Sequence, residues 1–196
     1  MTKRFFDSVV AAFALVLLSP LLLGIVLAVR FDSRGPALYR QERVGRHGVP
    51  FRIHKFRTMR HGAEGLLLTL PGDLRVTRVG AWLRRTRLDE LPQLVDVLQG
   101  TMSLVGPRPD VPRYVAQYPA ALRDRVLAVR PGITDPASLA HLNEAALLAR
   151  AADPEREYIE HILPLKLQHA ADYAEHATLA TDLAVLWRTL RALLTR

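Results

Sequence analysis

One long apolar run dominates the N-terminal part of the chain. Residues 9–29 read VVAAFALVLLSPLLLGIVLAV and contain no charged side chain. At about 1.5 Å per residue, a helix of this length could cross a hydrocarbon core of roughly 30 Å. Pro20 removes one backbone donor and its ring pushes against the carbonyl of Val16. We therefore expect a kink, with the Ser19 hydroxyl helping to satisfy the freed backbone.

Positive charge lies on both sides of this run. Lys3 and Arg4 precede it, and Arg30, Arg34 and Arg40 follow it. Because Lys and Arg are in excess on the cytoplasmic side of spanning helices, both flanks look cytoplasmic. Physical arguments alone leave two interpretations of the run. It is either a helix that spans the membrane or a re-entrant helix that leaves the membrane by the face it entered. A secretory signal is disfavoured, because the run exceeds the usual length of roughly 7 to 15 apolar residues.

A small basic β-hairpin is expected after the apolar run. The segments 37–41 and 50–56 have the composition of short strands, and Gly45 and Gly48 mark the turn between them. The loop that follows contains a leucine cluster at 66–68, which we expect to contact membrane or core.

Two helices are predicted next. Residues 75–87 form a short basic helix with five arginines and no acidic residue. Residues 88–100 repeat apolar side chains at the i, i+3, i+4, i+7 spacing of an amphipathic helix. Because Pro92 is tolerated only in a first turn, this helix is expected to start near Asp89. Asp89 is then its N-cap, Glu90 lies just inside, and a glycine caps the other end.

The rest of the chain is predicted to be mainly helical, which makes the fold α+β and mostly helical. Residues 103–115 contain too many prolines for a helix and form a rigid loop that holds Arg108 between two prolines. The last helix has apolar side chains and Trp187 on one face and arginines on the other. Such a helix lies in a membrane interface or packs on the protein core. The helices are expected over 119–128, over 157–176 with a kink at Pro164, and over 181–196.

Composition and charge narrow the function classes. A chain of 196 residues has room for one domain with its own core and a membrane anchor. The absence of cysteine excludes a disulfide framework and sulfur-ligated metal sites. The net charge is +8, and residues 30–61 carry nine Lys or Arg against two acidic residues. This block favours an anionic partner, but charge alone does not choose among lipid headgroups, a nucleotide diphosphate and nucleic acid.

The candidate chemistry centres on Asp89 and Glu90, the only adjacent Asp-Glu pair in the chain. Two carboxylates among many cations suit a metal-bound pyrophosphate, with Mg²⁺ held by carboxylate and phosphate oxygens. An aspartate can also attack phosphorus and form an acyl phosphate. Alternatively, the acidic pair has only a structural role and caps the positive end of a helix. The basic residues expected to hold phosphates lie at strand ends, in the basic helix or beside proline turns: Lys55, Arg57, Arg84, Arg108 and Arg130.

Other site classes find little support. The chain has no P-loop, no GxGxxG and no GxSxG. The basic stretches lack the interleaved aromatic residues of a nucleic-acid surface, so no nucleic acid is expected as a partner.

Four blocks of the chain, in order, resemble the bacterial sugar transferase family, the monotopic polyprenyl-phosphate phosphoglycosyl transferases. They are KRFFDSVVAAFALVLLSPLLL at 3–23, DSRGPALYRQERVGRHGVPFRIHKFRTM at 32–59, LDELPQLVDVLQGTMSLVGPRP at 88–109 and RPGIT at 130–134. The resemblance implies a re-entrant membrane helix over 1–30, broken at Ser19-Pro20. It also implies a catalytic domain over 31–196 that rests through interfacial helices on the cytoplasmic face of the bacterial inner membrane.

The resemblance also implies an activity. Members of this family transfer a sugar-1-phosphate from a UDP-sugar to a polyprenyl phosphate, release UMP and use Mg²⁺, as the first membrane step of a surface-glycan pathway. In this scheme Asp89 is the nucleophile and Glu90 its partner for metal or proton handling. Lys55, Arg84, Arg108 and Arg130 match basic family positions that hold phosphates. The expected partners are polyprenyl phosphate, a UDP-sugar and inner-leaflet lipids, and a homodimer is compatible with the family.

This chain departs from the family pattern at three places. It reads RPGITDPASLAHLNE at 130–144, where many members read RPGITGLAQVNGR, which leaves sugar recognition open. Ala170 stands where members often carry an acid, and Asp172 is the candidate substitute. Arg87 stands where serine or threonine is frequent. Two other interpretations are kept: a catalytically silent membrane scaffold of a glycan assembly complex, and a basic membrane-surface protein that binds lipid or nucleic acid.

Overall fold

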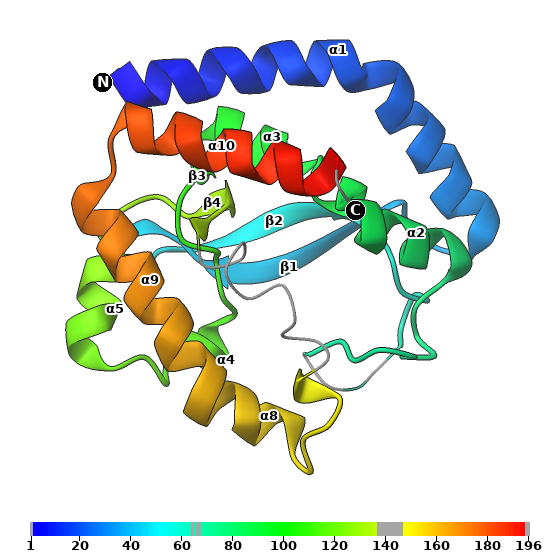
Figure 1. The fold of residues 1–196 in the computed structure, drawn as a ribbon. Helices are drawn as coiled ribbons and strands as arrows, with labels where there is room; N and C mark the ends of the chain where they lie inside the picture. The colour runs from blue at the N-terminus through cyan, green and yellow to red at the C-terminus, as the bar shows by residue number, and fades with distance from the viewer. Residues whose placement is uncertain (1, 64, 66–67, 137–146, 195–196) are drawn as a thin grey trace.

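A computed structural model describes residues 2–63, 65, 68–136 and 147–194 of the chain. Helices dominate it and two small sheets complete it, which confirms the mostly helical α+β class. Figure 1 shows α1 along one side of the molecule, with α10 beside it and the β1–β2 hairpin in the middle. The elements are α1 (Thr2–Asp32), β1 (Leu38–Val44), β2 (Pro50–Phe56), α2 (Arg78–Thr86), α3 (Gln93–Gln99), β3 (Ser103–Val105), α4 (Pro112–Val115), α5 (Ala120–Val126), β4 (Gly132–Thr134), α8 (Pro154–Glu157), α9 (Leu163–His176) and α10 (Leu179–Leu194).

Helix α1 contains the apolar run and bends along its length (Figure 1). The Ser19 hydroxyl donates a 2.8 Å hydrogen bond to the carbonyl of Val16, which confirms that it satisfies the acceptor freed by Pro20. The helix stays continuous through this point. Among the described residues it is long and apolar enough to cross a membrane, and only 11% of its most apolar window is buried. Length and composition do not distinguish a spanning from a re-entrant helix.

Both ends of α1 are attached to the rest of the protein. Near its C-terminal end, Ile25 and Val29 pack with Phe56 and Leu83 in one apolar cluster. Near its N-terminal end, the buried carboxylate of Asp7 accepts a 2.7 Å hydrogen bond from the Ser103 hydroxyl.

The same N-terminal end of α1 is joined to α10. The ammonium of Lys3 forms an ion pair with the buried Asp182 of α10, whose carboxylate also accepts from the hydroxyl of Tyr173 in α9. These polar contacts fix the N-terminal end of α1 to α9, α10 and β3.

The predicted hairpin is confirmed, with a longer first strand. Strand β1 pairs antiparallel with β2, and the turn is closed by a short 3-10 helix over Arg46–Gly48. Tyr39 lies directly opposite Lys55 in this register. Because side chains alternate along a strand, Tyr39, Gln41 and Arg43 share one face of the hairpin with Lys55.

The segment predicted as one rigid loop contains further structure. Strand β3 pairs in parallel with β4, and α4 is a single turn with a proline at its start. Gly106 and Gly132 let the two chains approach closely, since a Cβ on Gly132 would lie 2.1 Å from the amide nitrogen of Gly106. Strands of three residues carry too few alternations to be recognised in the sequence.

The expected start of the helix at 88–100 was wrong. Helix α2 ends at Thr86, its C-cap Arg87 adopts a left-handed conformation (φ 59°), and a 3-10 turn over Leu88–Glu90 follows. Helix α3 begins only at Gln93, so Asp89 does not cap it. The reason is local: the left-handed Arg87 redirects the chain into a tight turn before Pro92 permits a regular helix. The glycine cap is confirmed, because Gly100 ends α3 at φ 85°.

The C-terminal half is helical as expected. Helix α5 confirms the helix predicted over 119–128, and Pro164 lies in the first turn of α9, after a π turn over Tyr158–Ile162. Leu68, the last residue of the predicted leucine cluster, packs against the core, whereas Leu66 and Leu67 lie outside the described residues. Residues 137–144, most of the segment that departs from the family pattern, also lie outside them.

Candidate active site

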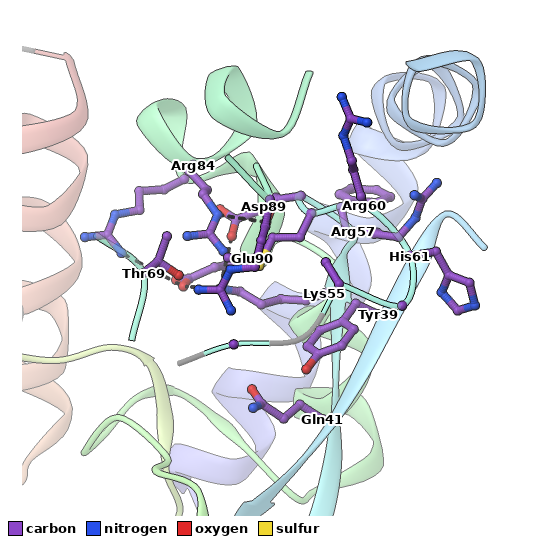
Figure 2. A pocket seen from close by; sticks show the side chains of 18 of the residues that line it. Tyr39, Gln41, Lys55, Arg57, Arg60, His61, Thr69, Arg84, Asp89 and Glu90 are labelled. Carbon is purple, nitrogen blue, oxygen red and sulfur yellow. Dashed lines mark hydrogen bonds and ion pairs between the residues drawn. The ribbon is translucent and has the colours of Figure 1, made fainter. Parts of the chain in front are cut away.

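A pocket of about 820 Å³ lies between the hairpin, the end of α2 and the 3-10 turn that carries Asp89 and Glu90. Figure 2 shows the side chains that line it. Its charge is strongly positive, since seven arginines and Lys55 face two carboxylates. Such a surface attracts anions with several negative charges, as a diphosphate has. The charged lining residues are Arg43, Lys55, Arg57, Arg60, Arg75, Arg84, Arg87, Arg108, Asp89 and Glu90.

Lys55 from β2 joins the two carboxylates. Its ammonium lies 3.0 Å from Oδ2 of Asp89 and 3.1 Å from Oε1 of Glu90. Both carboxylates are buried, Asp89 with 3% and Glu90 with 6% of its surface exposed. Residues separated by more than thirty positions in the chain thus form one charged cluster at the pocket wall.

The second oxygen of Asp89 is chemically distinctive. Oδ1 is buried and accepts no hydrogen bond from any of the residues that the structure describes. A buried carboxylate oxygen without a donor is costly, because its hydration has been lost and nothing replaces it. Lys55 thus holds one oxygen of Asp89, and the other oxygen has unused capacity to accept a hydrogen bond or to ligate a metal ion.

Glu90 is held more fully than Asp89. Arg108, between its two prolines, donates to both oxygens of Glu90, with the contact to Oε2 at 3.3 Å. Burial alone would raise the pKa of Glu90, but the charges of Arg108 and Lys55 hold that pKa far below its usual value. The same pairing raises the pKa of Arg108. Glu90 is therefore ionised at neutral pH and anchors the two cations.

Two further arginines lie around this cluster. Arg84, in the last turn of α2, donates a 2.8 Å hydrogen bond to the Thr58 hydroxyl. Burial lowers the pKa of Arg84, and the neighbouring Asp89 opposes that shift. The guanidinium of Arg87 lies 3.9 Å from Glu90. Arg87 thus lines the pocket, although it was not among the residues predicted to hold phosphates.

The structure separates the other two predicted phosphate ligands from this cluster. Arg57 is buried, and its guanidinium donates to backbone carbonyls and a hydroxyl in the segment 29–36, at the end of α1. These contacts favour a structural role, although Arg57 borders the pocket, and its phosphate role stays a prediction. Arg130 does not line the pocket; it donates to the carbonyl of Gly100 at the end of α3. Asp172 lies outside the pocket as well and pairs with Arg125.

The sequence interpretation missed the uncharged residues of β1 that line the pocket. Tyr39 and Gln41 project from β1 into the pocket on the side of Lys55 (Figure 2). The signal that could have identified them is the alternation of β1, which places them on the same face as Lys55.

The metal-ligating capacity of the site is limited to the carboxylate pair. The described residues hold no cluster of three or more His, Asp, Glu or Cys able to bind a metal ion by themselves. Asp89 and Glu90 could therefore hold a divalent cation only together with oxygens of a bound ligand.

Comparison with known proteins identifies the family of this chain. The model of the family described as "Bacterial sugar transferase" matches residues 1–196. The chain is 37% identical to the UDP-N-acetylgalactosamine-undecaprenyl-phosphate N-acetylgalactosaminephosphotransferase of Aeromonas hydrophila. The alignment extends over 197 residues and covers 98% of this chain and 44% of the Aeromonas protein.

Two further relatives carry related names. The UDP-glucose:undecaprenyl-phosphate glucose-1-phosphate transferase of Caulobacter vibrioides is 39% identical over 206 residues, 98% of this chain and 70% of that protein. The exopolysaccharide production protein PSS of Rhizobium leguminosarum bv. phaseoli is 47% identical over 109 residues, 54% of either chain. The chain thus spans less than half of the Aeromonas protein and about 70% of the Caulobacter protein. By the full-length family match and these identities, the chain belongs to the bacterial sugar transferase family.

Proposed function

We propose that the chain is a phosphoglycosyl transferase that moves a sugar-1-phosphate from a UDP-sugar to undecaprenyl phosphate and releases UMP. The names of the relatives support the acceptor and the sugar phosphate. The observation that carries the proposal is Oδ1 of Asp89, which is buried and has no hydrogen-bond partner among the described residues, in a pocket lined by cations. The cations of such a pocket suit a diphosphate, and the carboxylate of Asp89 borders the place where it would bind.

The chain's own residues support a two-step transfer. The carboxylate of Asp89 attacks the phosphorus that bears the sugar, so an oxygen-phosphorus bond forms and the bond to UMP breaks. UMP leaves with the electron pair of that bond. An oxygen of undecaprenyl phosphate then attacks the same phosphorus, and Asp89 is released as carboxylate. Lys55, Arg84 and Arg108 neutralise the charge on the phosphate oxygens.

The donor set fits the expected Mg²⁺. Oδ1 of Asp89 has no competing donor among the described residues, whereas the oxygens of Glu90 already face Arg108 and Lys55. Asp89 would be the main protein ligand, with Glu90 adding a contact and donor phosphates completing the shell. When bound, the ion would neutralise negative charge on the diphosphate and make UMP a better leaving group. A silent scaffold would have no need for this intact carboxylate pair.

The test is an assay of UMP release. We expect the detergent-purified protein, incubated with undecaprenyl phosphate and Mg²⁺, to release UMP from at least one of UDP-glucose, UDP-galactose, UDP-GlcNAc and UDP-GalNAc. Chelation of the metal with EDTA should lower this rate at least about 100-fold, and added Mg²⁺ should restore it. Release of UMP from none of these donors, in the presence of Mg²⁺ and lipid acceptor, would contradict the proposed function.

The apolar surface supports a position at a membrane face. Helix α1 exposes about half of its apolar side chains, and α10, which lies beside it (Figure 1), exposes Leu183, Trp187 and Leu190. We propose that α1 is re-entrant, that α10 lies in the interface, and that residues 31–196 rest on the cytoplasmic face of the inner membrane. The charges on both flanks of α1 and the bend supported by Ser19 favour this arrangement.

Cysteine labelling tests this topology, because the chain has no natural cysteine. Single cysteines at Thr2 and at Arg34, both exposed and on opposite sides of the apolar run, are the reporters. We expect a membrane-impermeant thiol reagent to label both positions in inverted membrane vesicles and neither in intact cells with a permeable outer membrane. Labelling of the two positions from opposite sides would show that α1 spans the membrane.

A further inference from the structure

Gln41 has a defined orientation in the pocket. The guanidinium of Arg43 donates a 2.6 Å hydrogen bond to the side-chain oxygen of Gln41. A guanidinium has only donors, so the atom that it contacts must be the amide oxygen. The amide nitrogen of Gln41, with its two donors, is then the end without a partner among the described residues.

Arg43 is itself held in place. Its other terminal nitrogen donates a 3.0 Å hydrogen bond to the carbonyl of Pro109, next to Arg108, and it lies 3.9 Å from Asp110. The orientation of Gln41 is therefore set by the same rigid loop that supplies Arg108 to Glu90. A polar group supported in this way gives directional recognition, because little conformational freedom is lost on binding.

The surroundings of Gln41 define which part of a ligand it would meet. Tyr39 pairs with Lys55 in the hairpin and lies between Gln41 and the N-terminal end of β1. Tyr39 and Gln41 line the same pocket as Asp89 (Figure 2). Phosphate groups are drawn to Lys55 and to the arginines around Asp89, whereas the Arg43 guanidinium already contacts Gln41, Pro109 and Asp110. An uncharged donor beside an aromatic ring suits the hydroxyl or amide oxygens of a neutral group.

We propose that Gln41, oriented by Arg43 and flanked by Tyr39, binds the sugar of the donor nucleotide and determines which sugar is accepted. This inference rests on the proposed function. In the donor, the sugar is bonded through one oxygen to the phosphorus that Asp89 attacks, whereas the base is separated from it by a second phosphate and the ribose. Tyr39 and Gln41 occupy consecutive positions on the pocket face of β1, beginning opposite the lysine that contacts Asp89. That place corresponds to the sugar.

The test compares two leucine variants of β1. Gln41→Leu removes the pocket donor at nearly unchanged volume, and Glu42→Leu makes a matched change on the exposed, opposite face of the same strand. Steady-state UMP release is measured with the four UDP-sugars named above, and UDP without sugar serves as a competitive inhibitor. A thermal melt of each variant controls for folding.

We expect Gln41→Leu to lower kcat/KM for the preferred UDP-sugar at least about tenfold and to change the preference between two of the sugars at least about fivefold. Inhibition by UDP and the KM for undecaprenyl phosphate should stay within about twofold, and Glu42→Leu should behave as the unaltered protein in all assays.

Three results would overturn the inference. A parallel weakening of UDP inhibition would assign Gln41 to the base, the ribose or the diphosphate. An equal loss for all four sugars, or no loss, would exclude a role in sugar selection. If the unaltered protein releases no UMP from any donor, the proposed function fails and the inference fails with it; the other outcomes leave the proposed function standing.

Discussion

Asp89→Asn is expected to abolish sugar-phosphate transfer, with a loss of at least about 1,000-fold in the rate of UMP release. The amide has nearly the shape of the carboxylate but neither its charge nor its nucleophilicity, so the first bond to phosphorus cannot form. The structural basis of this expectation is the buried Oδ1, to which no residue in the described part of the chain donates a hydrogen bond. Lys55 would also lose one of its two anionic partners.

Intact-mass spectrometry separates the covalent mechanism from a direct transfer. With UDP-sugar and no lipid acceptor, we expect the unaltered protein to gain the mass of one sugar phosphate and the Asp89→Asn variant to gain none. Asp124→Asn is the matched control, because the Asp124 side chain is 81% exposed and does not line the pocket. Full turnover by the Asp89→Asn variant would contradict the nucleophilic role of Asp89.

Arg108→Met is expected to reduce both stability and activity. The change leaves the buried Glu90 carboxylate with Lys55 as its close cationic partner. Removal of one member of a buried ion pair is strongly destabilising; because a third of the Arg108 side chain is exposed, we expect a loss of about 2 kcal/mol in the free energy of unfolding. The rate of UMP release should fall about 100-fold, since a cation that stabilises transferred phosphate is lost.

The stability deficit of Arg108→Met should depend on pH. In the folded protein the pKa of Glu90 lies below its ordinary value of 4.5. The stabilisation by the ion pair is therefore fully present above this value and is lost as the pH falls below it. Thermal unfolding in detergent at pH 7 and pH 4 should show a smaller deficit at pH 4.

Arg113→Met is the matched control for this prediction. Arg113 also pairs with a glutamate, Glu155, at 3.0 Å, but its side chain is 63% exposed. Surface pairs contribute little, so we expect a change of at most about 0.5 kcal/mol at either pH. Two results would contradict the prediction: Arg108→Met loses no more stability than Arg113→Met, or it loses more stability at pH 4 than at pH 7. Either result would show that Arg108 does not stabilise the ionised carboxylate of Glu90.

Much of the local structure is encoded in short segments of the chain. The apolar run predicts α1, Ser19 and Pro20 predict the bend and its hydrogen bond, and the glycines between two short strands predict the hairpin. The carboxylate pair and the proline-flanked Arg108 were also recognisable as candidate chemistry. These signals act over a few residues, through backbone dihedral preferences and the periodicity of apolar side chains, and so a single sequence carries them.

The tertiary structure decided how these parts combine. It placed Lys55, Arg84 and Arg108 around Asp89 and Glu90, and it moved the start of α3 to Gln93, which left the carboxylates in a tight turn. No local pattern distinguishes a cation that binds phosphate from one that caps a helix or holds a chain end. Only long-range packing assigns Arg130 to the end of α3 and Arg57 to the end of α1.

The uncharged side of the pocket also depends partly on the local sequence and partly on the tertiary structure. Alternation along β1 determines that Tyr39 and Gln41 share a face with Lys55. That this face borders the carboxylates, and that Arg43 holds the amide oxygen of Gln41, depends on the loop at Pro109, more than sixty residues away in the chain. The sequence by itself therefore determined the elements and the kinds of groups available. The fold, by bringing distant segments into contact, determined which of these groups form the site.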